Sequence, residues 1–168
     1  MTAGVGAEGA QRALDARARC IAVHVGAGLY GLPIEYVQEV SEDRPVTRVF
    51  HAPPVVAGVT SLRGEVLAVL DLALLLGVPA PESGRGGRIV VVRELGPRRR
   101  RAGLRIGALA GLRDLPEAGL APLATTVSES LRALAAGVIP DPPPCVVLDV
   151  PRLFDAPALE AVAGATEP

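Results

Sequence analysis

The chain contains no lysine and no asparagine, and all seventeen of its basic residues are arginine. Mechanisms that need a lysine are therefore excluded, including Schiff-base chemistry and the lysine that binds nucleotide phosphates in a P-loop. Aromatic residues are also scarce, with two Tyr, two Phe and no Trp among 168 residues. Because 49% of the residues are hydrophobic, the core must be aliphatic. This length suits one domain, or two small lobes joined closely.

Residues for catalysis and metal binding are few. His24 falls on the outward side of an alternating run and His51 precedes two prolines, and neither has an acidic or nucleophilic partner nearby in the sequence. The chain has no Cys-x-x-Cys pair, no histidine pair at helical spacing and no acidic calcium loop. Asp71 and Asp149 end corresponding strands, which favours turn-forming roles over an acidic catalytic pair. We therefore expect no enzyme, no metal and no cofactor.

Charge and hydropathy limit the partners and the location. The net charge is −1, so no overall field attracts nucleic acid or an acidic membrane surface. The run Arg98 to Arg101 could neutralise phosphates, but it occupies a predicted hairpin tip without an aromatic platform. No run approaches the about 18 apolar residues that a membrane span needs. We expect a cytoplasmic protein that neither binds nucleic acid nor inserts directly into a membrane.

The two cysteines, Cys20 and Cys145, are far apart in the sequence and each lies beside an apolar run. This placement favours buried, reduced thiols. A disulfide is the alternative, although no secretory signal accompanies it.

The clearest local pattern is a hairpin between Gly58 and Leu76. Two apolar runs rich in Val and Leu flank the polar corner Arg63-Gly64-Glu65, where Gly64 permits a tight turn. Arg63 is then expected at an exposed tip, suited to partner contact, although an exposed hairpin arginine is often inert. Residues 72–76 are expected to form one helical turn, stopped by Gly77 and Pro79.

The second half of the chain repeats the first in outline. The apolar run 88–92 parallels 20–25, residues 102–106 parallel 30–34, and 145–150 parallels 67–71. Residues 35–40 can form a helical turn or a strand. The segment 127–136 favours a helix by propensity, but we expect a strand from about Gly137 after a loop or short helix. Short strands between Gly and Pro turns, without strong amphipathic helices, predict two similar β-lobes.

The hairpin carries a resemblance to a known family. Its sequence is similar to the Gly-Val-x-Asn-Leu-Arg-Gly motif of the CheW family, the coupling proteins of bacterial chemotaxis-type signalling, with Ser61 in place of Asn and Ala68 in place of Pro. The likeness extends to Leu29-Tyr30-Gly31-Leu32-Pro33-Ile34-Glu35-Tyr36-Val37-Gln38-Glu39-Val40, to Pro45-Val46-Thr47-Arg48 and to Ala52-Pro53-Pro54. It covers roughly residues 19 to 160.

The resemblance implies an all-β fold of two five-stranded SH3-like barrels, with short helices at the connection and the C-terminus. It places a CheW-like domain at 18–160, with lobe one at about 26–80 and lobe two at about 88–156. A flexible tail at 1–17, a linker at 79–87, a terminal helix at 157–165 and a tail at 161–168 complete the expected organisation.

The resemblance also implies a non-enzymatic adaptor between the cytoplasmic tip of a methyl-accepting chemoreceptor and the regulatory domain of a CheA-type histidine kinase. The residues that match partner-binding positions are Arg63, Gly64, Val37, Glu39, Leu109 and Leu112. Core packing is the competing interpretation for Val37. Two alternatives remain open: a CheW-like scaffold for gliding, development or biofilm control, and a small-ligand sensor or enzyme that uses a groove between the barrels. Gly107 and the turn at 141–144 depart from the family pattern and leave the particular partner open.

Overall fold

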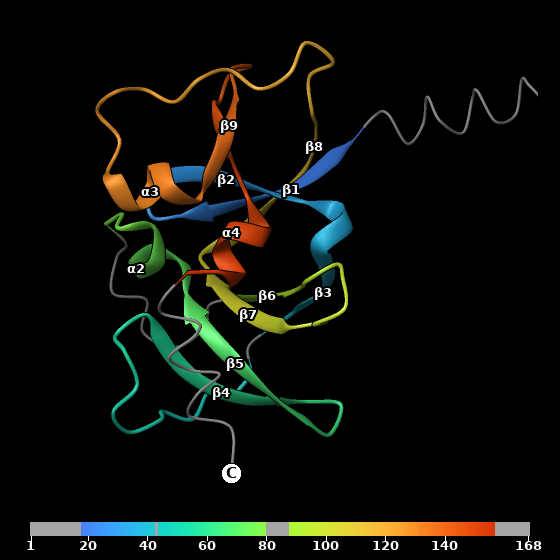
Figure 1. Cartoon of the computed structure of the whole chain (residues 1–168), viewed down its shortest axis with the longest axis vertical. Helices are drawn as coiled ribbons and strands as arrows, with labels where there is room; N and C mark the ends of the chain where they lie inside the picture. Colours follow the sequence, from blue (N-terminus) through green and yellow to red (C-terminus); the bar gives the residue numbers. More distant parts are fainter. Residues whose placement is uncertain (1–17, 43, 80–87, 157–168) are drawn as a thin grey trace, which may run out of the picture.

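Two five-stranded sheets form most of the computed structural model, which describes residues 18–42, 44–79 and 88–156 (Figure 1). The strands are β1 (Arg19–Val25), β2 (Gly28–Pro33), β3 (Val37–Ser41), β4 (Val56–Leu62), β5 (Glu65–Asp71), β6 (Arg88–Arg93), β7 (Arg101–Ile106), β8 (Ala108–Asp114), β9 (Ala135–Ile139) and β10 (Cys145–Leu148). The helices are η1 (Ile34–Tyr36), α2 (Leu72–Leu76), α3 (Glu129–Leu134) and α4 (Val150–Phe154). One sheet has the order β8-β1-β2-β10-β9 and the other β3-β6-β7-β5-β4. The all-β class with short helices is confirmed.

Each sheet closes on itself through a short bridge. In the second sheet, Thr47 and Val59 exchange two backbone hydrogen bonds of 2.8 Å, which join the segment after β3 to β4. In the first sheet, Ala121 and Val138 exchange the same pair, also at 2.8 Å, which joins the segment after β8 to β9. We call the first sheet barrel A and the second barrel B. Closure leaves fewer unpaired backbone groups at the sheet edges.

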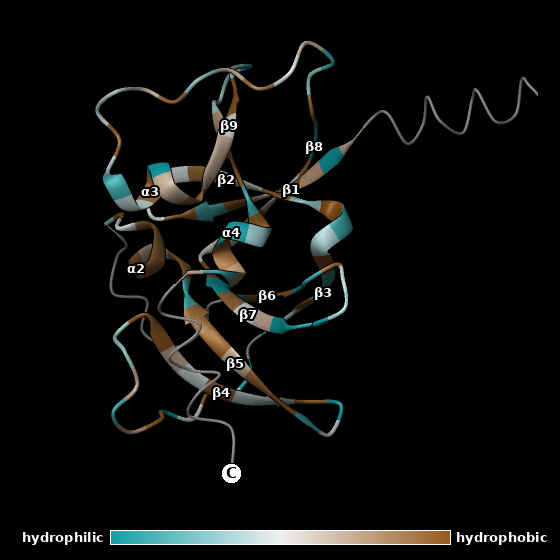
Figure 2. Ribbon diagram, viewed as in Figure 1, coloured by the Kyte–Doolittle hydropathy of each residue, from teal (hydrophilic) through white to brown (hydrophobic). Residues whose placement is uncertain are grey.

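The apolar side chains form one shared core and two smaller ones. The shared core contains residues of both barrels together with α2, α3 and α4, which lie between the two sheets (Figure 1). The smaller cores fill the barrels themselves, with Cys20 and Ile139 in barrel A and Leu67 and Ile89 in barrel B. Figure 2 shows α2 and much of β5 coloured as hydrophobic. Because alternate strand residues face a barrel interior and the shared core, runs such as 89–92 are apolar throughout.

The internal repeat is visible in the topology, but the two halves are exchanged between the barrels. Strands β1 to β5 and β6 to β10 occupy equivalent positions in the two sheet orders. However, β1 and β2 belong to barrel A with β8 to β10, whereas β6 and β7 belong to barrel B with β3 to β5. The predicted division of strands into lobe one at about 26–80 and lobe two at about 88–156 is therefore wrong.

The exchange has a clear physical basis. The turn η1 carries the chain from barrel A to barrel B, and the turn at Gly107 carries it back. Strand β2 then pairs in parallel with β10, and β7 pairs in parallel with β5. These pairings join the first hairpin of each repeat, β1–β2 or β6–β7, to strands of the other repeat. A strand shows the same alternation of apolar residues whether its neighbour comes from its own repeat or from the other one. The sequence pattern therefore did not show which strands belong to the same barrel.

The short helices are positioned by their capping residues. Asp71 Oδ1 accepts a hydrogen bond of 3.1 Å from Leu74 N, and Asp149 Oδ1 accepts one of 3.2 Å from Arg152 N. The expected structural turn roles of both aspartates are confirmed. Gly77 ends α2, as predicted, and it has the left-handed conformation.

Two ambiguous segments are also settled. Residues 35–40 contain both a helical turn, η1, and a strand, β3. The predicted strand near Gly137 is present, preceded by the short helix α3, and begins two residues earlier at Ala135. The expected tails and the helix at 157–165 lie outside the described residues.

Candidate partner-binding surface

Arg63 lies at the tip of the β4–β5 hairpin, where the sequence places it. Leu62 pairs with Glu65, which leaves Arg63 and Gly64 as the two turn residues. Their φ angles are 50° and 81°, so both have the left-handed conformation that a tight two-residue hairpin requires. A Cβ at Gly64 would meet nothing within 4 Å, so the space beside the turn is open. The fold thus presents Arg63 on a short, well-defined turn.

The structure brings Arg63 together with Glu39, a second residue matched to the family's binding surface. Arg63 Nη2 lies 3.2 Å from Glu39 Oε2, which joins the hairpin tip to β3. The Arg63 side chain is 78% exposed, whereas that of Glu39 is 21% exposed. An ion pair of this exposure contributes little to stability, but it restricts the orientation of the guanidinium group. Arg63 therefore keeps donors available at the surface.

The other predicted residues divide between the two barrels. Val37 lies on β3 near Glu39 and is half-buried against the shared core, which agrees with the core-packing interpretation. We call Val37, Glu39, Arg63 and Gly64 the hairpin surface. Leu109 and Leu112 instead lie on β8 of barrel A, the equivalent edge strand. Leu109 packs against the shared core, and Leu112 is 58% exposed.

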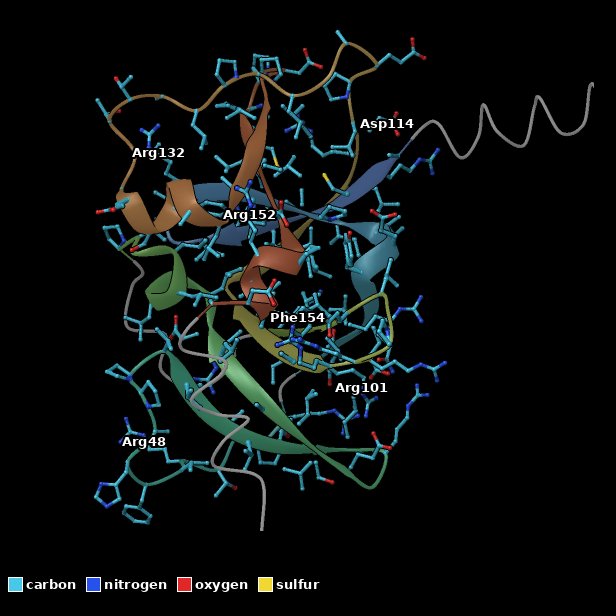
Figure 3. All side chains as sticks on the ribbon, in the orientation of Figure 1. Arg48, Arg101, Asp114, Arg132, Arg152 and Phe154 are labelled. Carbon is cyan, nitrogen blue, oxygen red and sulfur yellow. The ribbon has the colours of Figure 1, made fainter. Side chains whose placement is uncertain are left out.

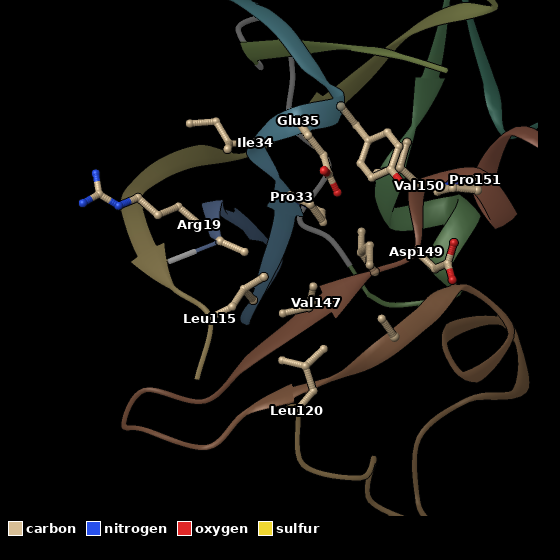
Figure 4. A pocket seen from close by; sticks show the side chains of 14 residues that line it. Arg19, Pro33, Ile34, Glu35, Leu115, Leu120, Val147, Asp149, Val150 and Pro151 are labelled. Atoms are coloured by element: carbon tan, nitrogen blue, oxygen red, sulfur yellow. The ribbon is translucent and has the colours of Figure 1, made fainter. Parts of the chain in front are cut away.

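A groove of about 700 Å³ lies at the edge of the junction between the barrels, beside η1. We call it the junction groove. Figure 4 shows Pro33, Leu115, Leu120 and Val147 around it, with the carboxylates of Glu35 and Asp149 nearby. Residues of the shared core, among them Tyr36, Leu148 and Val150, also line the groove. The sequence analysis did not identify the residues that line this groove. The apolar stretch Leu32-Pro33-Ile34 was the available signal, and Ile34 is exposed in the structure.

One titratable group in the junction groove has a shifted pKa. Burial, with smaller contributions from the carboxylates of Glu35 and Asp149, raises the pKa of Tyr36 above its ordinary value. The phenol therefore stays protonated at neutral pH and can donate a hydrogen bond. The groove combines apolar residues with the neutral Tyr36 hydroxyl, two acidic groups and Arg19, whose guanidinium is paired with Asp114. This lining suits an apolar side chain from a partner better than an anion.

Among the residues that the structure describes, the remaining reactive side chains lie apart from one another, except for the neighbouring thiols of Cys20 and Cys145. Within the described ranges, no group of three or more His, Cys, Asp or Glu could hold a metal ion. His24 and His51 are both exposed, on a strand and in a loop respectively. Cys20 and Cys145 are buried free thiols, as predicted. None of the helices in the described ranges is long and apolar enough to span a membrane.

Comparisons with known proteins agree with one another. The family model for the CheW-like domain matches residues 19–158. The probable chemotaxis protein CheW of Rhizobium etli is 30% identical over 120 residues, which cover 71% of this chain and 75% of that protein. The chemotaxis protein CheW of Rhizobium meliloti is 30% identical over 119 residues, with the same coverage.

A solved structure extends the likeness to the fold. The crystal structure of the scaffolding protein TtCheW from Thermoanaerobacter tengcongensis superposes with a TM-score of 0.71 at 26% sequence identity. The superposition covers 84% of this chain and 95% of that one. Since the family model spans nearly all of the described residues and both barrels superpose on a CheW scaffold, the chain belongs to the CheW-like domain family.

Proposed function

We propose that this protein is a non-enzymatic adaptor that couples chemoreceptors to a CheA-type histidine kinase in the cytoplasm. The observation that carries the proposal is the family match over residues 19–158, which includes both barrels. Membership of this family supports a scaffolding role in chemotaxis, as do the names of the relatives. The receptor tip and the kinase regulatory domain are the proposed partners.

The proposed coupling uses two surfaces of different chemistry. The hairpin surface offers a mostly exposed guanidinium that Glu39 orients. Arginine at a partly desolvated contact often carries a large share of the binding energy, while its neighbours mainly exclude water. Leu112 on β8 offers an exposed apolar contact on the other barrel. We assign Arg63, Gly64, Val37 and Glu39, with Leu109 and Leu112, to partner binding.

The junction groove is a suitable place for a receptor helix to insert a side chain. Its lining includes Ile34, which is 47% exposed, and the neutral Tyr36 hydroxyl beside it. A helix that lays its apolar face against such a groove would bury an anchoring side chain there. Interfaces of this transient kind are modest in area and depend on few residues.

The test is kinase activation in reconstituted arrays that contain the receptor and kinase from the same organism. Arg63→Glu is expected to weaken coupling by about tenfold, equivalent to about 1.4 kcal/mol. Arg48→Glu is the matched control because Arg48 is also exposed but lies in a different loop. Ile34→Glu tests the junction groove in the same assay. Equal activation by wild type, Arg63→Glu and Arg48→Glu would refute a role for the hairpin surface.

A further inference from the structure

A second hollow, of about 650 Å³, lies at the end of barrel B between the β4–β5 and β6–β7 hairpins. Its lining includes Gln38, Glu65, Arg93, Leu95, Arg99 and Arg101. We call it the arginine depression. It is separate from the junction groove, and it draws its arginines from an arginine-rich hairpin tip that the proposed function does not use.

The carboxylates in the arginine depression are already engaged. Glu94 accepts two hydrogen bonds from the Arg100 guanidinium, from Nε at 2.9 Å to Oε2 and from Nη2 at 2.8 Å to Oε1, and a third from Arg100 N at 3.4 Å to Oε2. Glu65 forms an ion pair with Arg101 across the two hairpins. Because Glu94 and Glu65 are each paired with an arginine, they do not neutralise the charge of a further arginine in the depression. Arg100 accordingly lowers the pKa of Glu94 through this hydrogen bonding, which keeps Glu94 ionised.

Two arginines of the depression have no such counter-charge. Arg93 and Arg99 are exposed, and within the described residues neither forms an ion pair with a carboxylate. Arg99 lies in the β6–β7 loop with a φ of 51°, and its side chain is exposed and lines the depression. Two guanidinium groups of the depression, those of Arg93 and Arg99, are thus left without an ion-pair partner among the described residues.

The hairpin that carries these arginines is fixed to the rest of the molecule. Arg100 Nη1 donates to the Phe154 carbonyl oxygen at 3.0 Å, and Nη2 donates to Asp155 Oδ1 at 3.0 Å. Its guanidinium also lies 5.6 Å from the centre of the Phe154 ring. Figure 3 shows Arg101 and Phe154 in this region, with Arg48 on the opposite side of barrel B. A hairpin held in this way loses little conformational entropy when a ligand binds.

We propose that the arginine depression binds an acidic segment of a partner protein. Arg93 and Arg99 would receive carboxylates of the segment through charge-assisted hydrogen bonds, which guanidinium groups form well with planar carboxylates. Leu95 is 51% exposed in the lining and supplies a contact for an apolar side chain. The segment therefore carries Asp or Glu beside an aliphatic residue. This inference goes beyond the coupling role and does not depend on it.

The composition of the depression favours a peptide over nucleic acid. None of the lining residues is aromatic, so the depression offers no platform on which bases could stack. Within the described residues the depression offers two unpaired guanidinium groups, Arg93 and Arg99, which are too few to follow a continuous phosphate backbone. Separate carboxylates on a peptide can instead approach the two unpaired arginines and avoid the acidic residues.

The test is fluorescence anisotropy with the purified full chain and a short labelled peptide of alternating Glu and Leu. We expect binding that weakens between about 0.05 M and about 0.3 M salt, because exposed charges are screened over that range. The double variant Arg93→Gln/Arg99→Gln is expected to lose about tenfold in affinity. The control Arg48→Gln/Arg132→Gln changes the net charge equally at exposed positions elsewhere and is expected to lose less than about twofold.

Three outcomes would overturn the proposal: no binding by the wild type, equal loss in both double variants, or tighter binding of a labelled single-stranded oligonucleotide that the Arg93→Gln/Arg99→Gln variant abolishes. Thermal unfolding of each variant checks that the fold is intact. Receptor and kinase are absent from this assay, so its failure leaves the adaptor role untouched. Failure of Arg63→Glu to affect arrays would likewise leave the arginine depression untouched.

Discussion

Gly58 and Gly137 occupy equivalent positions in the two barrels, each beside the bridge that closes its barrel. Gly58 pairs with Val69 and Gly137 with Val147, two residues before the capping aspartates Asp71 and Asp149 in each case. A Cβ at Gly58 would collide with the Thr47 carbonyl, and one at Gly137 would approach Leu120 Cβ to 2.5 Å. Both barrels therefore close around a position that accepts no side chain without a shift.

Gly58→Ala is expected to destabilise the protein strongly for this reason. Gly58 combines a φ of 148° with backbone contact, so the added methyl group meets a carbonyl that cannot rotate away. We expect a loss of about 3 kcal/mol in the free energy of unfolding, measured by urea denaturation. Gly119→Ala is the matched control. Gly119 has a φ of 88° with nothing within 4 Å, and its substitution should cost about 1 kcal/mol. Equal losses would show that backbone conformation alone governs Gly58.

Much of the fold was predictable because local chemistry sets it. Gly64 indicates the central hairpin, Gly77 and Pro79 end the helical turn at 72–76, and the alternation of apolar residues indicates most strands. The exchange of hairpins between barrels was not predictable. The exchange depends on the parallel pairing of β5 with β7 and of β10 with β2. Because these strands are apolar on both faces, their sequences do not indicate which neighbour each will pair with.

The candidate site was predictable where a single turn defines it. The exposed position of Arg63 follows from the hairpin turn. Its ion pair with Glu39 could be predicted only by knowing the register of β3 against β6 and the path of β4. In the sequence, the four consecutive arginines from Arg98 to Arg101 cannot be told apart by their expected roles. In the folded chain, Arg100 is anchored to α4, Arg101 pairs with Glu65, and Arg99 is exposed. Contacts made across long sequence separations produce these differences.

Stability should depend on pH through Glu94. Hydrogen bonds from Arg100 lower the pKa of Glu94 in the folded state. The contribution of this pair to the free energy of unfolding is therefore complete above the unfolded-state pKa of about 4.3. It is lost as the pH falls through the lower folded-state pKa. Glu94→Gln is expected to cost about 1–2 kcal/mol at neutral pH, and the difference from wild type should shrink as the pH falls below about 4.

Urea denaturation across this pH range provides the measurement for Glu94. Glu117→Gln is the control, since Glu117 is exposed and makes no ion pair among the described residues. A difference between wild type and Glu94→Gln that stays constant from neutral to acidic pH would contradict the proposed stabilisation.

The two thiols should be unreactive in the native protein. Cys20 and Cys145 are both 0% exposed in the interior of barrel A. The neighbouring Cys145 thiol and burial raise the pKa of Cys20, which suppresses its reactive thiolate form. The hydrogen bond with Cys20 lowers the pKa of Cys145, so Cys145 is protected by its complete burial. A colorimetric thiol reagent should therefore label neither residue under native conditions and both in denaturant. Rapid native labelling of either cysteine would mean that barrel A opens readily.

Arg63 and Arg100 should differ sharply in their effect on stability, although both form ion pairs. Arg63 is 78% exposed and, within the described residues, forms one ion pair, with Glu39, so Arg63→Ala should change the free energy of unfolding by less than about 0.5 kcal/mol. Arg100 is 26% exposed and bonds to Glu94, Asp155 and the Phe154 carbonyl, so Arg100→Ala should cost about 2 kcal/mol. Denaturation of both variants beside wild type measures the contrast. If Arg63→Ala proved as costly as Arg100→Ala, Arg63 would be a structural residue, and weaker coupling by its variants would no longer indicate a partner contact.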